Sequence, residues 1–192
     1  METITKVYDR HQQARQAVSE LEQAGIASSD ISLVANKYVS EKYADVDDVS
    51  DAAAGAGIGA MVGGTAGLLA GLGLLAIPGL GPVVAAGWLA STAVGALAGG
   101  ATGGIIGALV DSGVPEDHAH VYSEAVRRGG TLLAVKVDES QAPRVRSILD
   151  RYQPIDPIRQ GADYRRGGWK QFDPQAEPYK LSEIEIERMR KL

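Results

Sequence analysis

Residues 55–71 read GAGIGAMVGGTAGLLAG, and glycine stands at every fourth position of this stretch. Residues 87–107 repeat the spacing, with Ser91 in place of one glycine. Side chains four residues apart lie on one face of an α-helix, and a glycine face lets another backbone approach closely. The spacing therefore predicts two helices that pack and self-associate through glycine faces. The ladder glycines are Gly55, Gly59, Gly63, Gly67, Gly71, Gly87, Gly95, Gly99, Gly103 and Gly107.

A proline- and glycine-rich sequence separates the two ladders. Residues 78–82 read PGLGP, and proline interrupts helices. We expect Pro78, Gly79, Gly81 and Pro82 to form the turn of a helical hairpin that spans residues 51–111, with its first helix over residues 51–77. Each glycine costs a helix about 1 kcal/mol relative to alanine, so close packing has to offset that penalty. The alternative is a disordered, low-complexity Gly/Ala tract.

Charge is missing from almost the whole predicted hairpin. Residues 52–110 contain no Asp, Glu, Lys, Arg or His, and they hold 17 of the 24 glycines. Such a segment suits lipid or a dry protein interior. The flanks carry aspartates and no excess of Lys or Arg that would orient a membrane hairpin. Insertion in a lipid bilayer and packing of many hairpins into a closed soluble particle both stay open, and either one requires a homo-oligomer.

The sequence before the hairpin predicts the first half of a small α/β domain. Within residues 1–43, the patterns indicate a strand over residues 3–8, a helix that Gly25 ends, and a strand over residues 31–35 with one face more buried. Residues 44–50 are polar and acidic and are expected to form a linker.

The sequence after the hairpin predicts the second half of the same domain. Within residues 112–158, we expect a helix that starts at Pro115, a strand over residues 131–137, a helix capped by Ser140, and a short edge strand near Ile155. The order βαβ…αβαβ predicts an α+β fold, a small ferredoxin-like α/β sandwich that the helical hairpin interrupts.

Residues 159–192 are expected to form an irregular tail that ends in a short helix. Ser182 and Glu185 make a capping box at the start of that helix. A helix of about ten residues does not persist alone in water, so it has to dock on a neighbouring subunit or a host shell. The expected tail-docking side chains are Leu181, Ile184, Met189 and Leu192. Earlier in the tail, arginines beside Trp169 either bind an anion or phospholipid headgroup or pack on the ring.

The composition argues against several classes of function. The chain has 192 residues, a formal net charge of −5 and no cysteine. The weakly acidic total argues against a general nucleic-acid binder, which normally shows a basic stripe. The absence of cysteine excludes thiol catalysis, disulfides and cysteine-ligated metals. His118 and His120 stand two residues apart and would face different directions on a helix, which does not predict a metal site. We expect a non-enzymatic protein that uses no cofactor, binds no nucleic acid and, without a visible secretory signal, is not secreted.

Several short motifs resemble a bacterial family. They are Val7-Tyr8 ahead of an alanine-bearing helix, DISLV at residues 30–34, GLGLLAIPGLGP at residues 71–82 and RRGGTL at residues 127–132. Over residues 1–178 the chain resembles the YflT-like general stress proteins, in their heat- or low-temperature-induced members with a glycine-rich insert. The resemblance implies a stress-induced bacterial protein, cytoplasmic or attached to the inner membrane, with no established catalysis.

Two functions remain after this reading. The first is a structural stress protein that self-assembles through its glycine hairpins. The alternative is an α/β module that binds or senses a small molecule and is anchored by the hairpin.

Overall fold

The computed structural model of the protein describes residues 1–36, 73–77, 80–89 and 104–176. The predicted linker at residues 44–50, most ladder glycines and the four tail-docking residues lie outside these ranges. In chain order the described elements are β1 (Glu2–Tyr8), α1 (His11–Gln23), a 3-10 turn (Ser28–Asp30), β2 (Ile31–Asn36), β3 (Gly73–Ile77), β4 (Gly81–Ala86), α6 (Gly104–Asp111), α7 (Glu116–Arg127), β5 (Thr131–Val137), α8 (Ala142–Arg151) and α9 (Pro157–Arg166).

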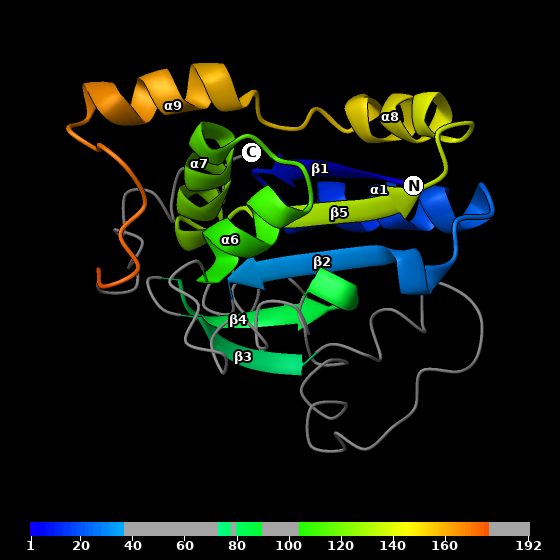
Figure 1. Ribbon diagram of the computed structural model, residues 1–192, viewed down its shortest axis with the longest axis horizontal. Helices are drawn as coiled ribbons and strands as arrows, with labels where there is room; N and C mark the ends of the chain where they lie inside the picture. The colour runs from blue at the N-terminus through cyan, green and yellow to red at the C-terminus, as the bar shows by residue number, and fades with distance from the viewer. Residues whose placement is uncertain (37–72, 78–79, 90–103, 177–192) are drawn as a thin grey trace.

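The strands form one antiparallel sheet in the order β1-β5-β2-β4-β3 (Figure 1). β5 lies between β1 and β2, so that Leu132 is opposite Val7 on one side and opposite Val34 on the other. β4 pairs with β2 on the outer side, and β3 forms the far edge. The fold combines helices with an antiparallel sheet, as the sequence predicts.

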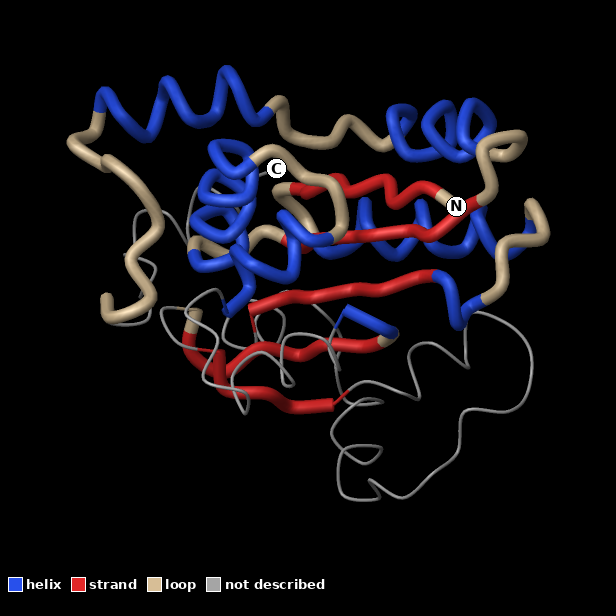
Figure 2. The backbone as a smooth tube through the Cα atoms, in the orientation of Figure 1, coloured by secondary structure: helices blue, strands red, loops and turns tan. Residues whose placement is uncertain are grey.

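Helices cover both faces of this sheet (Figure 2). On one face, α1 and α8 bury Leu21 and Leu149 against Leu33 of β2. On the other face, α6 and α7 bury Leu109 and Val126 against Val34. Because side chains alternate along a strand, β2 feeds both cores, and all of its residues are buried. This burial on two sides exceeds the one-sided pattern that we expect from the sequence.

The two halves that flank the inserted region form several of the elements that local sequence predicts. Residues 131–137 are a strand, and α1 buries the apolar face expected of it. Pro115 precedes α7 as its N-cap. Gly25 and Gly129, which follow α1 and α7, adopt φ values of +91° and +110° that other residues rarely take.

The helical prediction is wrong around the central turn. The chain does reverse between Ile77 and Gly81, but strands flank this reversal, and Gly81 and Pro82 are the first residues of β4. Pro78 and Gly79 lie outside the described residues. Short apolar runs such as Leu74–Ile77 suit a strand as well as a helix, and glycine and proline lower their helix propensity. Pairing of β4 with β2 then decides in favour of the sheet.

Three predictions for the second half also need correction. Residues 157–166 form helix α9 rather than an irregular tail, because Pro157 starts it and the Asp156 carboxylate accepts hydrogen bonds from the next free backbone N–H groups. Ile155 lies outside any strand, although its N–H donates to the carbonyl of Val7 at 2.8 Å. The N-cap of α8 is Gln141 instead of Ser140.

Candidate functional site

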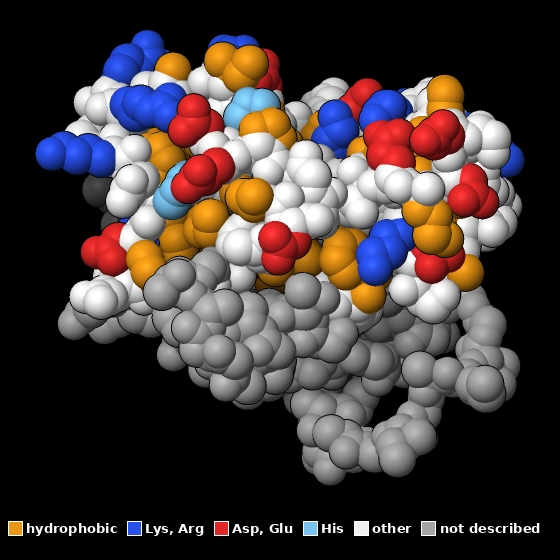
Figure 3. All heavy atoms as spheres, viewed as in Figure 1, with side chains coloured by type: hydrophobic (Ala, Val, Ile, Leu, Met, Phe, Trp, Pro, Cys, Tyr) orange, Lys and Arg blue, Asp and Glu red, His pale blue; other side chains and the backbone are white. Residues whose placement is uncertain are grey.

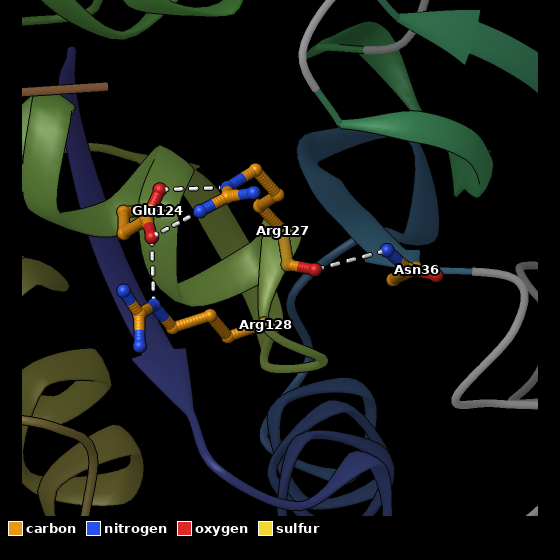
Figure 4. A network of polar contacts seen from close by, with 4 residues as sticks. All are labelled: Asn36, Glu124, Arg127 and Arg128. Carbon is orange, nitrogen blue, oxygen red and sulfur yellow. Dashed lines mark hydrogen bonds and ion pairs between the residues drawn. The ribbon is translucent and has the colours of Figure 1, made fainter. Parts of the chain in front are cut away.

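The C-terminal end of α7 holds a buried carboxylate between two arginines. Glu124 is 1% exposed. Its carboxylate accepts hydrogen bonds from Arg127 Nε at 2.8 Å and Nη2 at 2.7 Å, and from Arg128 Nε at 2.7 Å (Figure 4). Helical spacing of three and four residues brings both guanidinium groups to one side chain. A carboxylate this deeply buried is tolerated because both of its oxygens are paired with cations.

Asn36, the last residue of β2, forms a hydrogen bond to this end of α7. Its side-chain amide donates to the carbonyl of Arg127 at 3.2 Å and to the carbonyl of Leu80 at 3.4 Å. The last carbonyls of a helix have no partner within the helix, so Asn36 caps α7 from outside. Asn36 is 1% exposed and directly precedes residues 37–72. We call residues 37–72 and 90–103 the two inserts, and Asn36, Glu124, Arg127 and Arg128 the anchor cluster.

A second set of contacts fixes the chain just before residue 90. The hydroxyl of Ser32 accepts a hydrogen bond from the N–H of Leu89 at 2.9 Å, and both residues are buried. Gly87 has a φ of +86°, and a Cβ on it would lie 2.2 Å from the carbonyl oxygen of Ile31. Lys136 Nζ lies 3.9 Å from the centre of the Trp88 ring. The chain is therefore held tightly against β2 just before the second insert starts.

The anchor cluster contacts a group of aromatic rings and arginines on α9 and in the segment directly after it. Arg128 lies 4.5 Å from the centre of the Tyr164 ring, which meets Trp169 edge-on at 5.5 Å, and Arg165 lies 5.9 Å from Trp169. Burial raises the pKa of the Tyr164 phenol to about 12, so that the ring stays neutral beside Arg128. Arg165 therefore packs on the aromatic ring, which is the simpler of the two expectations for this segment.

The surface outside the sheet carries charges of both signs. Basic side chains gather at the upper left of Figure 3, over α9, with acidic side chains close by. Arg166 of α9 pairs with Asp163 of the same helix. This exposed pair contributes little to stability, in contrast to the buried cluster on α7.

α1 and α8 enclose a shallow groove of about 320 Å³. Glu20 stands on one side, where it pairs with Arg151 and accepts a hydrogen bond from the Tyr152 hydroxyl at 2.8 Å. Arg144 has no acidic partner among the described residues. The residues that line the groove are Glu20, Gln23, Ala24, Arg144, Ser147, Ile148 and Arg151.

Of the ten ladder glycines, the described part of the chain includes Gly87 and Gly107. Gly87 does approach another backbone closely, but that backbone belongs to strand β2 and not to a helix. Gly107 lies on α6, where a Cβ would meet no atom of the described residues within 4 Å. Among the described residues, neither glycine takes part in the helix–helix contact that the ladder predicts. The remaining ladder glycines lie outside the described residues.

The two histidines of α7 do not converge. The ring of His118 lies 6.5 Å from that of Tyr122, and Nδ1 of His120 is buried without a hydrogen-bond partner among the described residues. Across the described ranges, no three His, Asp or Glu side chains are placed to share a metal ion. The same ranges hold no helix with the length and apolar character needed to cross a bilayer.

Sequence reasoning missed Glu124 and Asn36. The spacing of Glu124 to Arg127 and Arg128 is a recognisable helix pattern, which could have suggested the ion pairs. Nothing local marks Asn36, because its partner Arg127 is 91 residues away. Comparisons of the chain with protein-family models, with curated proteins and with solved structures give no match.

Proposed function

We propose that the protein is a non-enzymatic bacterial stress protein of the YflT-like kind, which self-assembles through its two glycine-rich inserts. One observation carries the proposal: an uncharged stretch, residues 52–110, is inserted into a folded domain that carries the charges. Residues 73–77, 80–89 and 104–110 of this stretch belong to the folded domain itself. For the other uncharged residues, 52–72 and 90–103, other copies of the same chain supply the surface that buries them.

The positions at which the inserts leave and re-enter the domain support the proposal that the domain holds the inserts. Asn36 lies opposite Val83 at the start of β4, whereas Gly73 lies opposite Ala85 near its end. The residues that bound the first insert, Asn36 and Gly73, therefore lie opposite positions of β4 that are only two residues apart. The second starts beyond Leu89 and returns at Gly104. Both inserts leave the β2-β4-β3 half, and the α/β domain acts as the scaffold that presents them.

The site of assembly is the cytoplasm, either free as a closed particle or attached to the inner membrane. The mass of the purified full-length protein, measured by light scattering with and without detergent, tests both forms. A large particle without detergent supports soluble assembly. A protein that resists alkaline carbonate extraction and needs detergent supports the membrane form. A monomer in both conditions would overturn the proposal.

The ladder glycines within the two inserts are the proposed contacts of the assembly. Replacing Gly63 or Gly99 by leucine should reduce the mass of the particle, because a large side chain on a close-packed face keeps neighbouring backbones apart. Gly64→Leu makes the same change one residue off the ladder and serves as the matched control. Equal effects of Gly63→Leu and Gly64→Leu would show that the four-residue spacing has no role.

The tail helix is a further proposed contact. Its apolar side chains, from Leu181 to Leu192, would dock on a neighbouring subunit or on a host shell. Deletion of residues 181–192 should lower the mass of the particle or release it from the shell. Unchanged assembly and stability would remove the tail from the proposal.

For the α/β domain, a ferredoxin-like sandwich fold stays a prediction. Without β3 and α6, the succession of β1, α1, β2, β4, α7 and β5 supports it. The edge position of β1 and the helices on both faces are departures from a two-layer sandwich.

A second function is favoured by the groove between α1 and α8. Arg144 and Ser147 lie there beside Arg151, which pairs with Glu20, and the cationic Arg144 with a neighbouring hydroxyl suits a small anion. In this alternative, the α/β domain senses a phosphate or carboxylate compound while the inserts anchor it. A thermal shift with inorganic phosphate or citrate, lost in Arg144→Gln, would favour this reading over pure assembly.

A further inference from the structure

We infer that strand β3 pairs with β3 of a second copy of this chain, so that two sheets join into one. The inference rests on the proposed self-assembly and names one strand-to-strand contact within it. β3 is the outermost strand, and no described residue pairs with its outer edge. An unpaired edge presents a row of free N–H and C=O groups that another strand can fill.

The two edges of the sheet differ in how they are protected. On β1, the N–H of Ile155 donates a hydrogen bond to the carbonyl of Val7 at the outer edge. β1 also carries charged residues, and Lys6 pairs with Asp150 of α8 at 2.8 Å. Charges and covering segments are the devices that keep edge strands from pairing with other chains. β3, with the sequence GLLAI, has neither charge nor proline.

Pro82 determines which backbone groups of β3 face outward. In an antiparallel pair, opposite residues either exchange both hydrogen bonds or point their N–H and C=O groups away from each other. Pro82 has no N–H, so its pair with Ala76 is of the second kind. The ladder alternates, and Leu74 therefore shares this orientation with Ala76. The backbone N–H and C=O groups of Leu74 and Ala76 face the free edge.

A two-fold axis through Leu75 satisfies all of these groups at once. Leu74 of one copy then lies opposite Ala76 of the other, and each such pair exchanges both hydrogen bonds. The two copies of Leu75 face each other at the centre, and the antiparallel order of the sheet continues across the contact. No charge lies within residues 52–110, so like charges do not oppose the approach of two identical edges.

The size of this contact fits a component of a larger assembly. A pair of five-residue strands buries less area than the roughly 1,200–2,000 Å² of a stable interface. The inserts that flank the β3-β4 hairpin supply the rest in the proposed assembly. A competing occupant is the first insert folded back on the edge of its own β3, and the experiment below separates the two.

Single cysteines test the register, because the natural chain has none. In full-length protein under mild oxidation, Leu75→Cys should give a covalent dimer, since directly opposed residues lie about 4.5–5.5 Å apart and within reach of a disulfide. Ile77→Cys is the matched control, because the two copies of residue 77 would lie on the order of 13 Å apart along the strands. A mixture of Gly73→Cys and Ile77→Cys proteins should form a cross-linked heterodimer that neither forms alone.

A proline then tests the hydrogen bonds. Ala76→Pro removes an outward N–H and should abolish the cross-link of Leu75→Cys, whereas Ala76→Val keeps the N–H and should preserve it. If the protein assembles but Leu75→Cys does not cross-link, or cross-links no better than Ile77→Cys, the β3 pairing is wrong and self-assembly still stands. If the parent protein is a monomer, the proposed function fails as well.

Discussion

The side-chain amide of Asn36 lies 3.2 Å from the main-chain carbonyl of Arg127 and caps the end of α7. Asn36 is the last residue of β2 and directly precedes the first insert. This bond therefore joins the start of the insert to α7, the helix that carries the Glu124 ion pairs. The same amide reaches Leu80, in the turn between β3 and β4. One buried side chain thus holds the outer half of the sheet against α7.

We predict that Asn36→Leu lowers the free energy of unfolding by about 1–3 kcal/mol. The substitution leaves the buried carbonyl of Leu80 and the partly buried carbonyl of Arg127 without this donor, and an unsatisfied buried acceptor costs about that much. Urea denaturation measures the change. Gln12→Leu, a similar substitution at an exposed position of α1, should have little effect. Equal stability of Asn36→Leu and the parent would refute the capping role.

Glu124→Gln should be more costly, because it leaves two partly buried arginines without their carboxylate. Breaking a buried ion pair from one side costs up to 3–5 kcal/mol, and we expect about 2 kcal/mol because Arg128 is one-third exposed. Asp163→Asn removes a carboxylate that pairs with Arg166 at the surface, at the same helical spacing, and should cost at most about 0.5 kcal/mol. Denaturation curves in which the two variants match would contradict the assignment.

The parts of the fold that could be predicted are those with a clear local pattern. α7 has an amphipathic face that starts after Pro115, and Gly129 marks its end. β5 follows as an apolar run that contains β-branched residues. β3 and β4 lack such a signal, because the same short apolar residues fit either period and only pairing with β2 distinguishes them. The ladder spacing favoured the helix, and sheet pairing overrode it.

The candidate site was less accessible to sequence reasoning. Arg127 and Arg128 could be assigned to the end of a helix, where they suit the helix dipole. That Glu124 is buried depends on how α7 packs in the folded domain, and no local pattern reveals it. The capping of α7 by Asn36 needs knowledge of which strand ends beside which helix, and the inserts separate these in the chain.

The start of the predicted tail belongs to the core. Phe172 is 2% exposed and packs in the same apolar cluster as Val7 and Leu132. Phe172→Ala should therefore lower the free energy of unfolding by about 3 kcal/mol, the usual cost of deleting a buried ring. The neighbouring exposed substitution Gln171→Ala should be close to neutral in the same thermal or urea melt. A near-neutral Phe172→Ala would mean that residues after α9 are dispensable for the fold.

Gly87 should tolerate no side chain. An alanine there would combine a positive φ with a Cβ 2.2 Å from the carbonyl oxygen of Ile31, so β2 and β4 have to move apart. We expect a loss of more than about 3 kcal/mol, or no folded protein. Gly113 has a similar φ of +93°, and no described residue lies within 4 Å of its Cβ position, so Gly113→Ala isolates the backbone strain of about 1–2 kcal/mol. If Gly87→Ala and Gly113→Ala lower the free energy of unfolding by similar amounts, the close approach at Gly87 is refuted.

Acid should destabilise the protein through His11. Burial lowers the pKa of this imidazole to about 4, with a smaller contribution from Arg15, and its Nδ1 lies 3.3 Å from the hydroxyl of Thr131. The unfolded chain therefore binds a proton that the folded chain rejects between about pH 6.5 and pH 4, and stability falls as the pH drops through that window.

The expected loss from His11 is on the order of 3 kcal/mol at pH 4 relative to pH 7. His11→Gln removes the titrating group, while the carboxylates of the protein titrate in parent and variant alike. The difference between their unfolding free energies, measured by urea denaturation at several pH values, should therefore shift in favour of the variant as the pH falls from 6.5 to 4 and level off below. Arg15→Gln should raise the pKa of His11 in an NMR titration and narrow the window. Parallel stability curves for the parent and His11→Gln would show that His11 is not the acid-sensitive group.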